Sequence, residues 1–186
     1  MASAHFLVYN FYNMAKKISN KILIGLTGEK PDDLLLKIRE ANGFGLKEAS
    51  LFLELIEIAK RETPSGKFFA MHINEADKLE EKFDGIFMQA VLLHIHKKDA
   101  KKTIKKLLDK LKLGGYLYIA VKEKKSGGAD EEIKTENDYG YPYERFFSYF
   151  TLDEIKNLMK ELELEISYEN ISSFGHTRWI QVIGKK

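Results

Sequence analysis

The side chains best suited to chemistry in this chain follow one apolar run and one aromatic segment. His94 comes shortly after the apolar run Phe83–Met88, where an imidazole could act as a general base or contact a substrate. Tyr143 and Arg145 begin a dense aromatic segment and could face a substrate. Arg178 opens the last apolar run, where it could form a salt bridge or meet an anionic substrate. His94 and Tyr143 are therefore the catalytic candidates, and all four residues are candidate substrate contacts.

A metal site is the alternative use of the histidines. His94 and His96 flank Ile95, and on a strand their side chains would share one face. No third ligand is evident near them in the sequence, and the adjacent Lys97 and Lys98 would repel a cation. We therefore expect no metal.

These residues need elements that hold them at one edge of the fold. The run Phe83–Met88 is nearly all apolar, as in a strand covered on both faces. Apolar residues recur at helical spacing over Asp99–Leu111, Gly114–Gly115 ends that helix, and Tyr116–Val121 predicts another strand. Ligands of open α/β sheets bind at the carboxyl ends of parallel strands, which is where His94 falls.

The last third of the chain gives two clear signals. Thr151–Glu154 has the form of a capping box and predicts the start of a helix. Leu164–Ile171 and Arg178–Ile183 predict a terminal antiparallel hairpin. The polar, glycine-containing segment 124–144 is expected to be an irregular loop. Alternating strands and helices predict an α/β fold with a mixed, mostly parallel sheet and helices on both faces.

The first third gives shorter signals. Lys21–Leu26 predicts a short buried strand, residues 31–41 and 51–59 predict two helices, and Lys67–Ile73 predicts another strand. The stretch 1–20 is expected to form a helix, and the alternative for this stretch is a lid over a pocket. The docking face of that helix would consist of Phe6, Leu7, Phe11 and Met14.

Composition limits the functional classes. The 186 residues are 44% hydrophobic, which suits a single domain, 1–186, with a real core. The net charge of +2 makes no global case for nucleic acid or membrane binding, and the lysine-rich helix is interpreted as a solvated face. RNA or phosphate binding by that helix is the minority alternative. The absence of cysteine excludes disulfides and a cysteine nucleophile, and it is compatible with a cytoplasmic location.

From about Leu55 to Lys186 the chain resembles a small class I S-adenosylmethionine-dependent methyltransferase. The matching pieces are TPSGKFFAMHINEAD, KFDGIFMQAVLLHIHKKD, LLDKLKLGGYLYIAVKE, ERFFSYFTLDEIKNLMKEL and TRWIQVIGKK. The resemblance implies a three-layer Rossmann-like fold, mostly parallel with a C-terminal antiparallel hairpin, whose first half is either complete or trimmed. It also implies S-adenosylmethionine as cofactor and methyl transfer to a small-molecule acceptor.

The same resemblance gives the expected cofactor contacts. The family has an acid and a glycine-rich turn after its first strand, and ILIGLTGEK supplies Gly25 and Gly28 there without the acid. A second family acid falls at Gly45, with Glu48 three residues on, and a third falls at His72. The cofactor-binding residues expected on this basis are Gly25, Thr27, Gly28, His72, Ile73, Gln89 and Ala90.

Two functions therefore stay open. Losing one hydrogen-bond partner of the cofactor costs about 1–3 kcal/mol, and three family positions lack their usual polar group. The chain is either an active methyltransferase with a small-molecule substrate or a degenerate, non-catalytic relative that serves as an interaction or structural module for a protein partner. An altered sheet edge could favour a homodimer. Neither nucleic acid nor a membrane is an expected partner.

A second resemblance covers residues 22–54. LLLKIREANGFGLKEASLFLE is similar to the helix hairpin of the C-terminal domain of the bacterial ribosomal stalk protein. We interpret it as local similarity of form, without a translational role.

Overall fold

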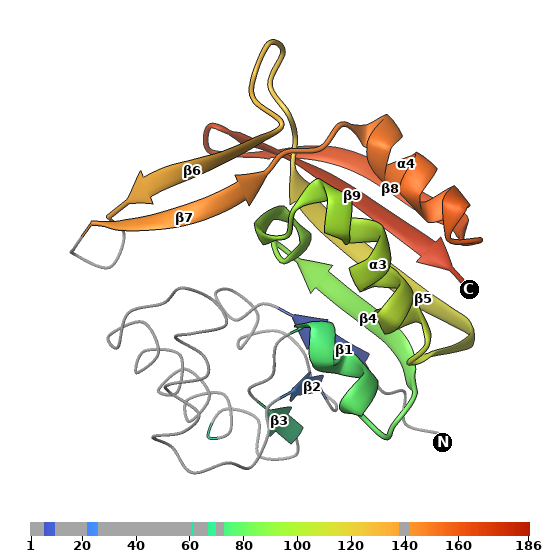
Figure 1. The fold of residues 1–186 in the computed structure, drawn as a ribbon. Coiled ribbons are helices and arrows are strands. Elements are labelled where there is room, and N and C mark those ends of the chain that lie inside the picture. Colours follow the sequence, from blue (N-terminus) through green and yellow to red (C-terminus); the bar gives the residue numbers. More distant parts are fainter. Residues whose placement is uncertain (1–5, 10–21, 26–60, 62–66, 70–72, 138–141) are drawn as a thin grey trace.

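The described part of the chain forms one seven-stranded sheet and one two-stranded sheet (Figure 1). The computed structural model describes residues 6–9, 22–25, 61, 67–69, 73–137 and 142–186. The order of the large sheet is β3-β2-β1-β4-β5-β9-β8, parallel from β3 to β5 and antiparallel at β9 and β8. Its strands are β1 (Phe6–Tyr9), β2 (Ile22–Gly25), β3 (Lys67–Phe69), β4 (Phe83–Gln89), β5 (Leu111–Lys122), β8 (Glu165–Phe174) and β9 (Thr177–Lys185).

β1 lies at the centre of the parallel part, between β2 and β4. Leu7 is in register with Leu23 on one side and with Ile86 on the other. The helix expected over residues 1–20 is therefore wrong at Phe6–Tyr9. Four consecutive apolar residues with aromatic and β-branched members suit a strand flanked on both sides, and such a short run cannot be distinguished from a helix by periodicity. Phe11 and Met14 lie outside the described residues.

This placement changes the match to the methyltransferase pattern. Ile22–Gly25 is a strand, as expected, but it occupies the second position of the sheet order. The segment ILIGLTGEK therefore does not follow the first strand, and its assignment to the first-strand turn is wrong. Because β1, β2 and β3 fill all three positions beside β4, the sheet is not trimmed. The helices expected over 31–41 and 51–59, and with them the stalk-like hairpin, lie outside the described residues.

The strand expected over Lys67–Ile73 is described as β3 over Lys67–Phe69, and residues 70–72 lie outside the described residues. Ile73, the last residue of that expectation, begins a 3₁₀ helix, η1 (Ile73–Lys78). That helix packs against α3 (Lys97–Leu108), the helix expected over Asp99–Leu111.

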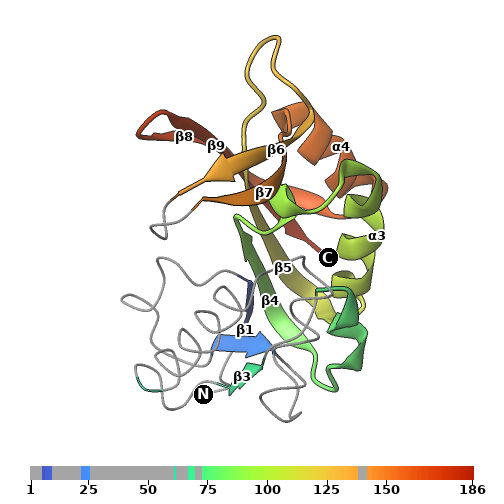
Figure 2. The same ribbon diagram turned by 60° about the vertical axis from the view of Figure 1, so that its left-hand side comes forward.

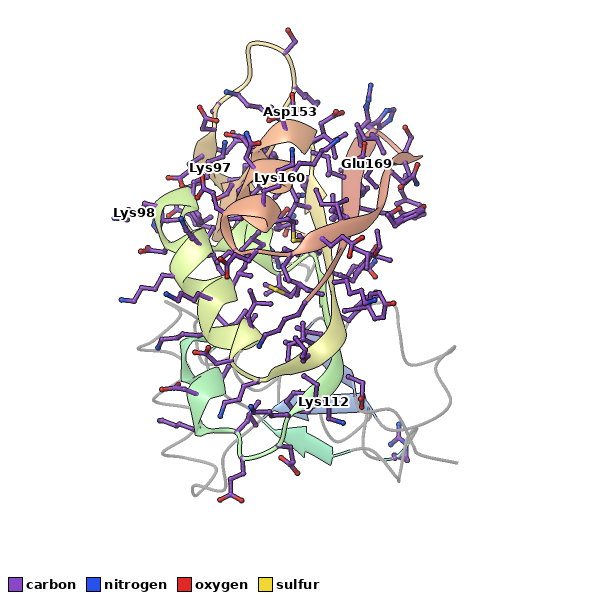
Figure 3. The ribbon with its side chains drawn as sticks, turned by 90° about the vertical axis from the view of Figure 1, so that its right-hand side faces the viewer. Lys97, Lys98, Lys112, Asp153, Lys160 and Glu169 are labelled. Atoms are coloured by element: carbon purple, nitrogen blue, oxygen red, sulfur yellow. The ribbon has the colours of Figure 1, made fainter. Side chains whose placement is uncertain are left out.

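The helix α3 has the two faces that its lysine pattern predicts. Its apolar residues are buried against the sheet, while Lys98 and its neighbouring lysines on that side are exposed. Figure 3 shows Lys98 projecting away from the ribbon. At the other end of the helix, Lys186 donates hydrogen bonds from Nζ to the carbonyl oxygens of Leu108 (2.5 Å) and Leu111 (3.0 Å). The cation thus satisfies acceptors at the negative end of the helix dipole.

The capping box and the terminal hairpin are confirmed. The Glu154 amide donates to Thr151 Oγ1 (3.2 Å), and the Thr151 amide donates to Glu154 Oε2 (2.7 Å), at the start of α4 (Leu152–Glu161). β8 and β9 pair antiparallel from Glu165 to Lys185. Helices α3 and α4 lie along the same face of the sheet (Figures 1 and 3).

The core lies between that face and the two helices. Every central element contributes fully or almost fully buried side chains. They include Phe83, Ile86 and Met88 of β4, Leu117, Ile119 and Val121 of β5, Ile104 and Leu107 of α3, Ile155 and Met159 of α4, and Ile180 and Val182 of β9. Within the described ranges, no helix is long and apolar enough to cross a membrane.

The sequence suggested an irregular loop over 124–144, but part of this segment forms a strand. β6 (Glu131–Glu136) and β7 (Tyr143–Ser148) form an antiparallel ribbon in which Ile133 pairs with Phe146. This ribbon reaches out beyond the carboxyl ends of β4 and β5 (Figures 1 and 2). Charged residues hide the strand signal, because a ribbon that stands away from the core needs few buried side chains.

Candidate functional site

The carboxyl ends of β4 and β5 form the edge at which a ligand is expected. Gln89 ends β4 opposite Ala120, and the Ala90 amide donates to the Ala120 carbonyl oxygen (2.9 Å). Ala90 has a φ of 54°, which is rare for a residue with a Cβ atom. The chain therefore turns sharply as it leaves the sheet, and it enters η2 (Leu92–His94) directly. Backbone strain of this kind is concentrated at functional sites.

Two buried leucines fix the position of His94. Leu92 and Leu93 are 0% and 1% exposed, so η2 is anchored in the core. His94 Nδ1 lies 2.9 Å from the carbonyl oxygen of Phe146 in β7. A carbonyl oxygen only accepts, so Nδ1 must carry the hydrogen, and in the neutral ring Nε2 keeps its lone pair. The contact thus sets the tautomer that a general base needs.

The imidazole of His94 is held neutral. Burial against β7 lowers its pKa from 6.5 to about 4, the hydrogen bond to Phe146 opposes that change, and the positive charges of Arg145 and Lys122 add to it. The residue still exposes part of its surface to water, which weakens the effect of burial. The two cations act in the same direction as burial. At neutral pH the His94 ring is therefore uncharged, and its Nε2 can accept a proton.

The loop after β4 is fastened to the base of the β6–β7 ribbon. Ser148 donates from Oγ to the Ile95 carbonyl oxygen (2.6 Å), and the Lys97 amide donates to Glu131 Oε1 (2.6 Å). The other oxygen of that carboxylate lies 3.2 Å from His96 Nδ1. Since His96 makes no side-chain cap of α3, Glu131 caps the helix from another element. The ribbon and the loop that carries His94 therefore form one unit.

Lys97 extends this unit to α4. Its Nζ lies 2.6 Å from Asp130 Oδ1 and 2.7 Å from Glu154 Oε1, and 5.2 Å from the centroid of Phe150. Burial works against the charge on Lys97, but the hydrogen bonds that its ammonium donates to Asp130 and Glu154 prevail and raise its pKa. Figure 3 shows Lys97 at the start of α3, on the side towards α4.

A group of charges lies at the end of β5 and on the adjoining face of the ribbon. Lys122 Nζ is 4.0 Å from the centroid of the Phe147 ring, which is 1% exposed. The ring of His94 lies 5.0 Å from the same Phe147 ring. Lys122 is thus a site residue that sequence reasoning missed. Its position at the end of a strand was visible, but its aromatic partner on β7 was not.

The predicted cofactor contacts are partly described. Gln89 and Ala90 lie together at the end of β4, and Gly25 lies at the end of β2, in register with Phe69. Ile73 begins η1 and packs against the core. The expected contacts Thr27, Gly28 and His72 lie outside the described residues, as do Gly45 and Glu48.

The four predicted substrate contacts do not all lie in one place. Arg145 and His94 lie in the same part of the site, because the Arg145 charge acts on the His94 ring. Arg145 Nη1 is 2.8 Å from Glu136 Oε2. Tyr143 is in register with Glu136, and only its backbone is described. Arg178 forms a salt bridge to Glu123 (2.6 Å), one of the two roles expected for it.

The rings of Phe146 and His96 are in tilted contact with centroids 4.1 Å apart, and Phe147, the next residue of β7, is the buried ring. In the described residues, His94 and His96 face a carbonyl oxygen and a carboxylate rather than each other, and no group of three candidate metal ligands occurs there.

Comparison with known proteins identifies the class. Residues 32–169, more than half of the chain, match the family model described as a methyltransferase domain, and the chain belongs to this family. The fold is that of class I S-adenosylmethionine-dependent methyltransferases, as the sequence predicted. No curated protein matches the chain significantly.

Solved structures agree on the fold. An S-adenosylmethionine-dependent methyltransferase from Methanosarcina mazei is 17% identical, with a TM-score of 0.66 over 99% of this chain and 92% of that one. The 1,6-didemethyltoxoflavin-N1-methyltransferase of Burkholderia thailandensis, bound to 1,6-didemethyltoxoflavin and S-adenosylhomocysteine, is 14% identical, with a TM-score of 0.64 over 99% and 71%. A magnesium protoporphyrin IX methyltransferase from Synechocystis PCC 6803, bound to S-adenosylhomocysteine, is 14% identical, with a TM-score of 0.53 over 72% and 60%.

Proposed function

We propose that this protein transfers the methyl group of S-adenosylmethionine to a small-molecule acceptor, with His94 as the general base. The observation that carries the proposal is the neutral His94 ring, whose Nδ1–H is held by the Phe146 carbonyl. That ring lies just beyond the carboxyl end of β4, where ligands of such sheets bind. A structural neighbour of the same fold holds both an acceptor and S-adenosylhomocysteine.

The residues at this edge suit such a cofactor. The amide of Gln89 can donate and accept, and the turn at Ala90 takes the chain away from the sheet where a ligand would lie across the strand ends. When bound, S-adenosylmethionine supplies an electrophilic methyl group on a sulfonium. His94 Nε2 would take the proton from the acceptor's nucleophilic atom as that atom bonds to the methyl carbon, while the bond from the methyl carbon to sulfur breaks and S-adenosylhomocysteine leaves. The remaining catalysis comes from alignment of the two reactants.

The runner-up is a relative that has lost its cofactor and binds a protein partner. One observation favours it. The central strand β1 is followed by residues 10–21, NFYNMAKKISNK, in which there is neither a glycine nor an acid. Contacts from other segments would then have to replace those of the usual glycine-rich turn, because a side chain keeps backbone and cofactor apart.

Calorimetric titration with S-adenosylmethionine and S-adenosylhomocysteine separates the two functions. The proposal predicts saturable binding of both at roughly micromolar strength, equivalent to about −8 kcal/mol. His94→Gln should bind both as the wild type does, because His94 is assigned to the acceptor. A folded protein that takes up neither ligand at millimolar concentration would contradict the proposal and favour the non-catalytic relative.

A further inference from the structure

The charges around Phe147 do not balance. Lys134 lies 3.0 Å from Glu132 Oε1, and Arg145 lies 2.8 Å from Glu136 Oε2. Lys122 is the third cation of this group. In the described part of the chain, no carboxylate comes within 4.0 Å of its Nζ. The group therefore has one positive charge more than it has carboxylates.

Lys122 is held in an environment that favours an anion. Its Nζ lies over the Phe147 ring, and burial lowers the pKa of this half-buried lysine. Glu136 and Glu132 act on it only from a distance, and the charges of Lys134 and Arg145 oppose theirs. An ammonium that has lost water without gaining a carboxylate gains strongly from an anionic partner.

The position of Lys122 indicates which ligand would supply an anionic group to it. It is the last residue of β5, at the carboxyl edge of the sheet, and the Phe147 ring that it contacts is also contacted by His94. An anion on Lys122 would thus lie beside the proposed base. Lys134 and Arg145, on the ribbon face that carries Phe147, add positive potential there, although each is already paired with a carboxylate.

We propose that Lys122 binds a carboxylate of the methyl acceptor, so that the substrate class is small organic acids. The proposal rests on the methyltransferase function given above. The buried Phe147 ring would hold the ammonium in place, the ammonium would bind the carboxylate, and a nucleophilic atom elsewhere on the same molecule would meet His94. The experiment must separate this role from two other uses of Lys122: a purely structural contact with Phe147, and binding of the carboxylate of the cofactor itself.

Benzoate and its neutral analogue benzamide are suitable probes, because they differ in charge but little in shape. Binding to the full chain is measured by ligand-observed NMR, with and without S-adenosylhomocysteine. We expect benzoate to bind about tenfold more tightly than benzamide, the usual benefit of one charge-assisted hydrogen bond. Lys122→Met should remove that difference, and Lys122→Arg should retain most of it. Lys98→Met, at an exposed lysine of α3, is the control and should change nothing.

Several results would overturn the proposal. One is that benzoate binds no better than benzamide to the wild type. Another is that a folded Lys122→Met protein keeps the wild-type preference for benzoate, or that Lys98→Met loses this preference to the same extent as Lys122→Met. Lys122→Met should also bind S-adenosylhomocysteine as the wild type does. Loss of that binding would assign Lys122 to the cofactor and overturn the acceptor role while leaving the methyltransferase function. Benzoate binding through Lys122 without any S-adenosylhomocysteine binding in the wild type would overturn the function, and with it the assignment to an acceptor.

Discussion

His94 and Lys122 contact the same buried ring, with Phe147 5.0 Å from the imidazole centroid and 4.0 Å from the ammonium nitrogen. The ring comes from β7, whereas His94 follows β4 and Lys122 ends β5. The β6–β7 ribbon therefore fixes the geometry between the proposed base and the proposed anion site. A change in the seating of the ribbon would alter both at once.

The titration of His94 is the first consequence. Its pKa of about 4 in the folded protein lies below the ordinary value of 6.5, so the unfolded chain binds more protons between these two values. Stability from the neutral ring is fully present above pH 6.5 and is lost as the pH falls towards 4. The wild type should therefore lose stability relative to His94→Gln over this range, as measured by urea unfolding at several pH values.

NMR of the histidine rings measures the pKa and the tautomer of His94 directly. Histidine resonances assigned with His94→Gln should show His94 neutral, with hydrogen on Nδ1, down to about pH 5, one unit above the expected midpoint. A midpoint near 6.5 would contradict the lowered pKa of His94, and hydrogen on Nε2 at neutral pH would contradict its assignment as a base.

Ala90 should tolerate glycine. Its φ of 54° is strained for a residue with a Cβ atom, by about 1–2 kcal/mol, and glycine removes that strain at the cost of a more flexible unfolded chain. Ala90→Gly should thus be close to neutral. Ala100→Gly, at a buried position inside α3, should lower the free energy of unfolding by about 1 kcal/mol. Equal losses in urea unfolding would show that Ala90 is not strained.

Glu131 should matter through the amide of Lys97. Glu131→Ala removes the acceptor that caps α3 and should lower the free energy of unfolding by about 1 kcal/mol, the usual effect of a helix cap. The hydrogen bond from the Lys97 amide, followed by that from His96, lowers the pKa of Glu131. This stabilisation is present above the ordinary carboxyl pKa and is lost as the pH falls through the lowered value.

Hydrogen exchange distinguishes the cap from a general surface effect. The Lys97 amide should exchange faster in Glu131→Ala than in the wild type, while Glu165→Ala, on exposed β8, leaves it unchanged. Unaltered protection of that amide would mean that Glu131 does not cap α3.

The two lysine pairs on α3 should differ in strength. Lys97 bridges Asp130 and Glu154 and is only 20% exposed, whereas Lys101 meets Glu161 with both side chains more than half exposed. Lys97→Met should lower the free energy of unfolding by about 1 kcal/mol or more, and Lys101→Met should stay within about 0.5 kcal/mol. Urea unfolding measures both, and a Lys101→Met loss as large as that of Lys97→Met would contradict the bridging role.

The second half of the fold could be predicted because its signals are local. The capping box at Thr151, the helical spacing of the apolar residues of α3 and the alternation in β9 each specify one element without reference to the others. β1 could not be predicted in this way. Four apolar residues suit a strand or a helix equally, and only their pairing with Leu23 and Ile86 decides between them.

The site was predicted in part for the same reason. His94 follows a strand that the sequence reveals, so its place at the sheet edge could be expected. The roles of Lys122 and Glu131 depend on partners distant in the sequence, Phe147 and the Lys97 amide, brought together by the ribbon. Charged strands such as EEIKTE give no hydrophobic alternation from which that ribbon could be inferred.

The most direct test of the account is a titration of the isotope-labelled 186-residue protein with S-adenosylhomocysteine, followed through its backbone amide resonances. We predict shifts concentrated at the carboxyl edge, among Gly25, Gln89, Ala90 and His94, with little change at Gly114 in the first part of β5 and at Lys186 after β9, both at the opposite edge. Absence of any shift at millimolar ligand, or shifts confined to that opposite end, would contradict the claim that this edge is a methyltransferase site.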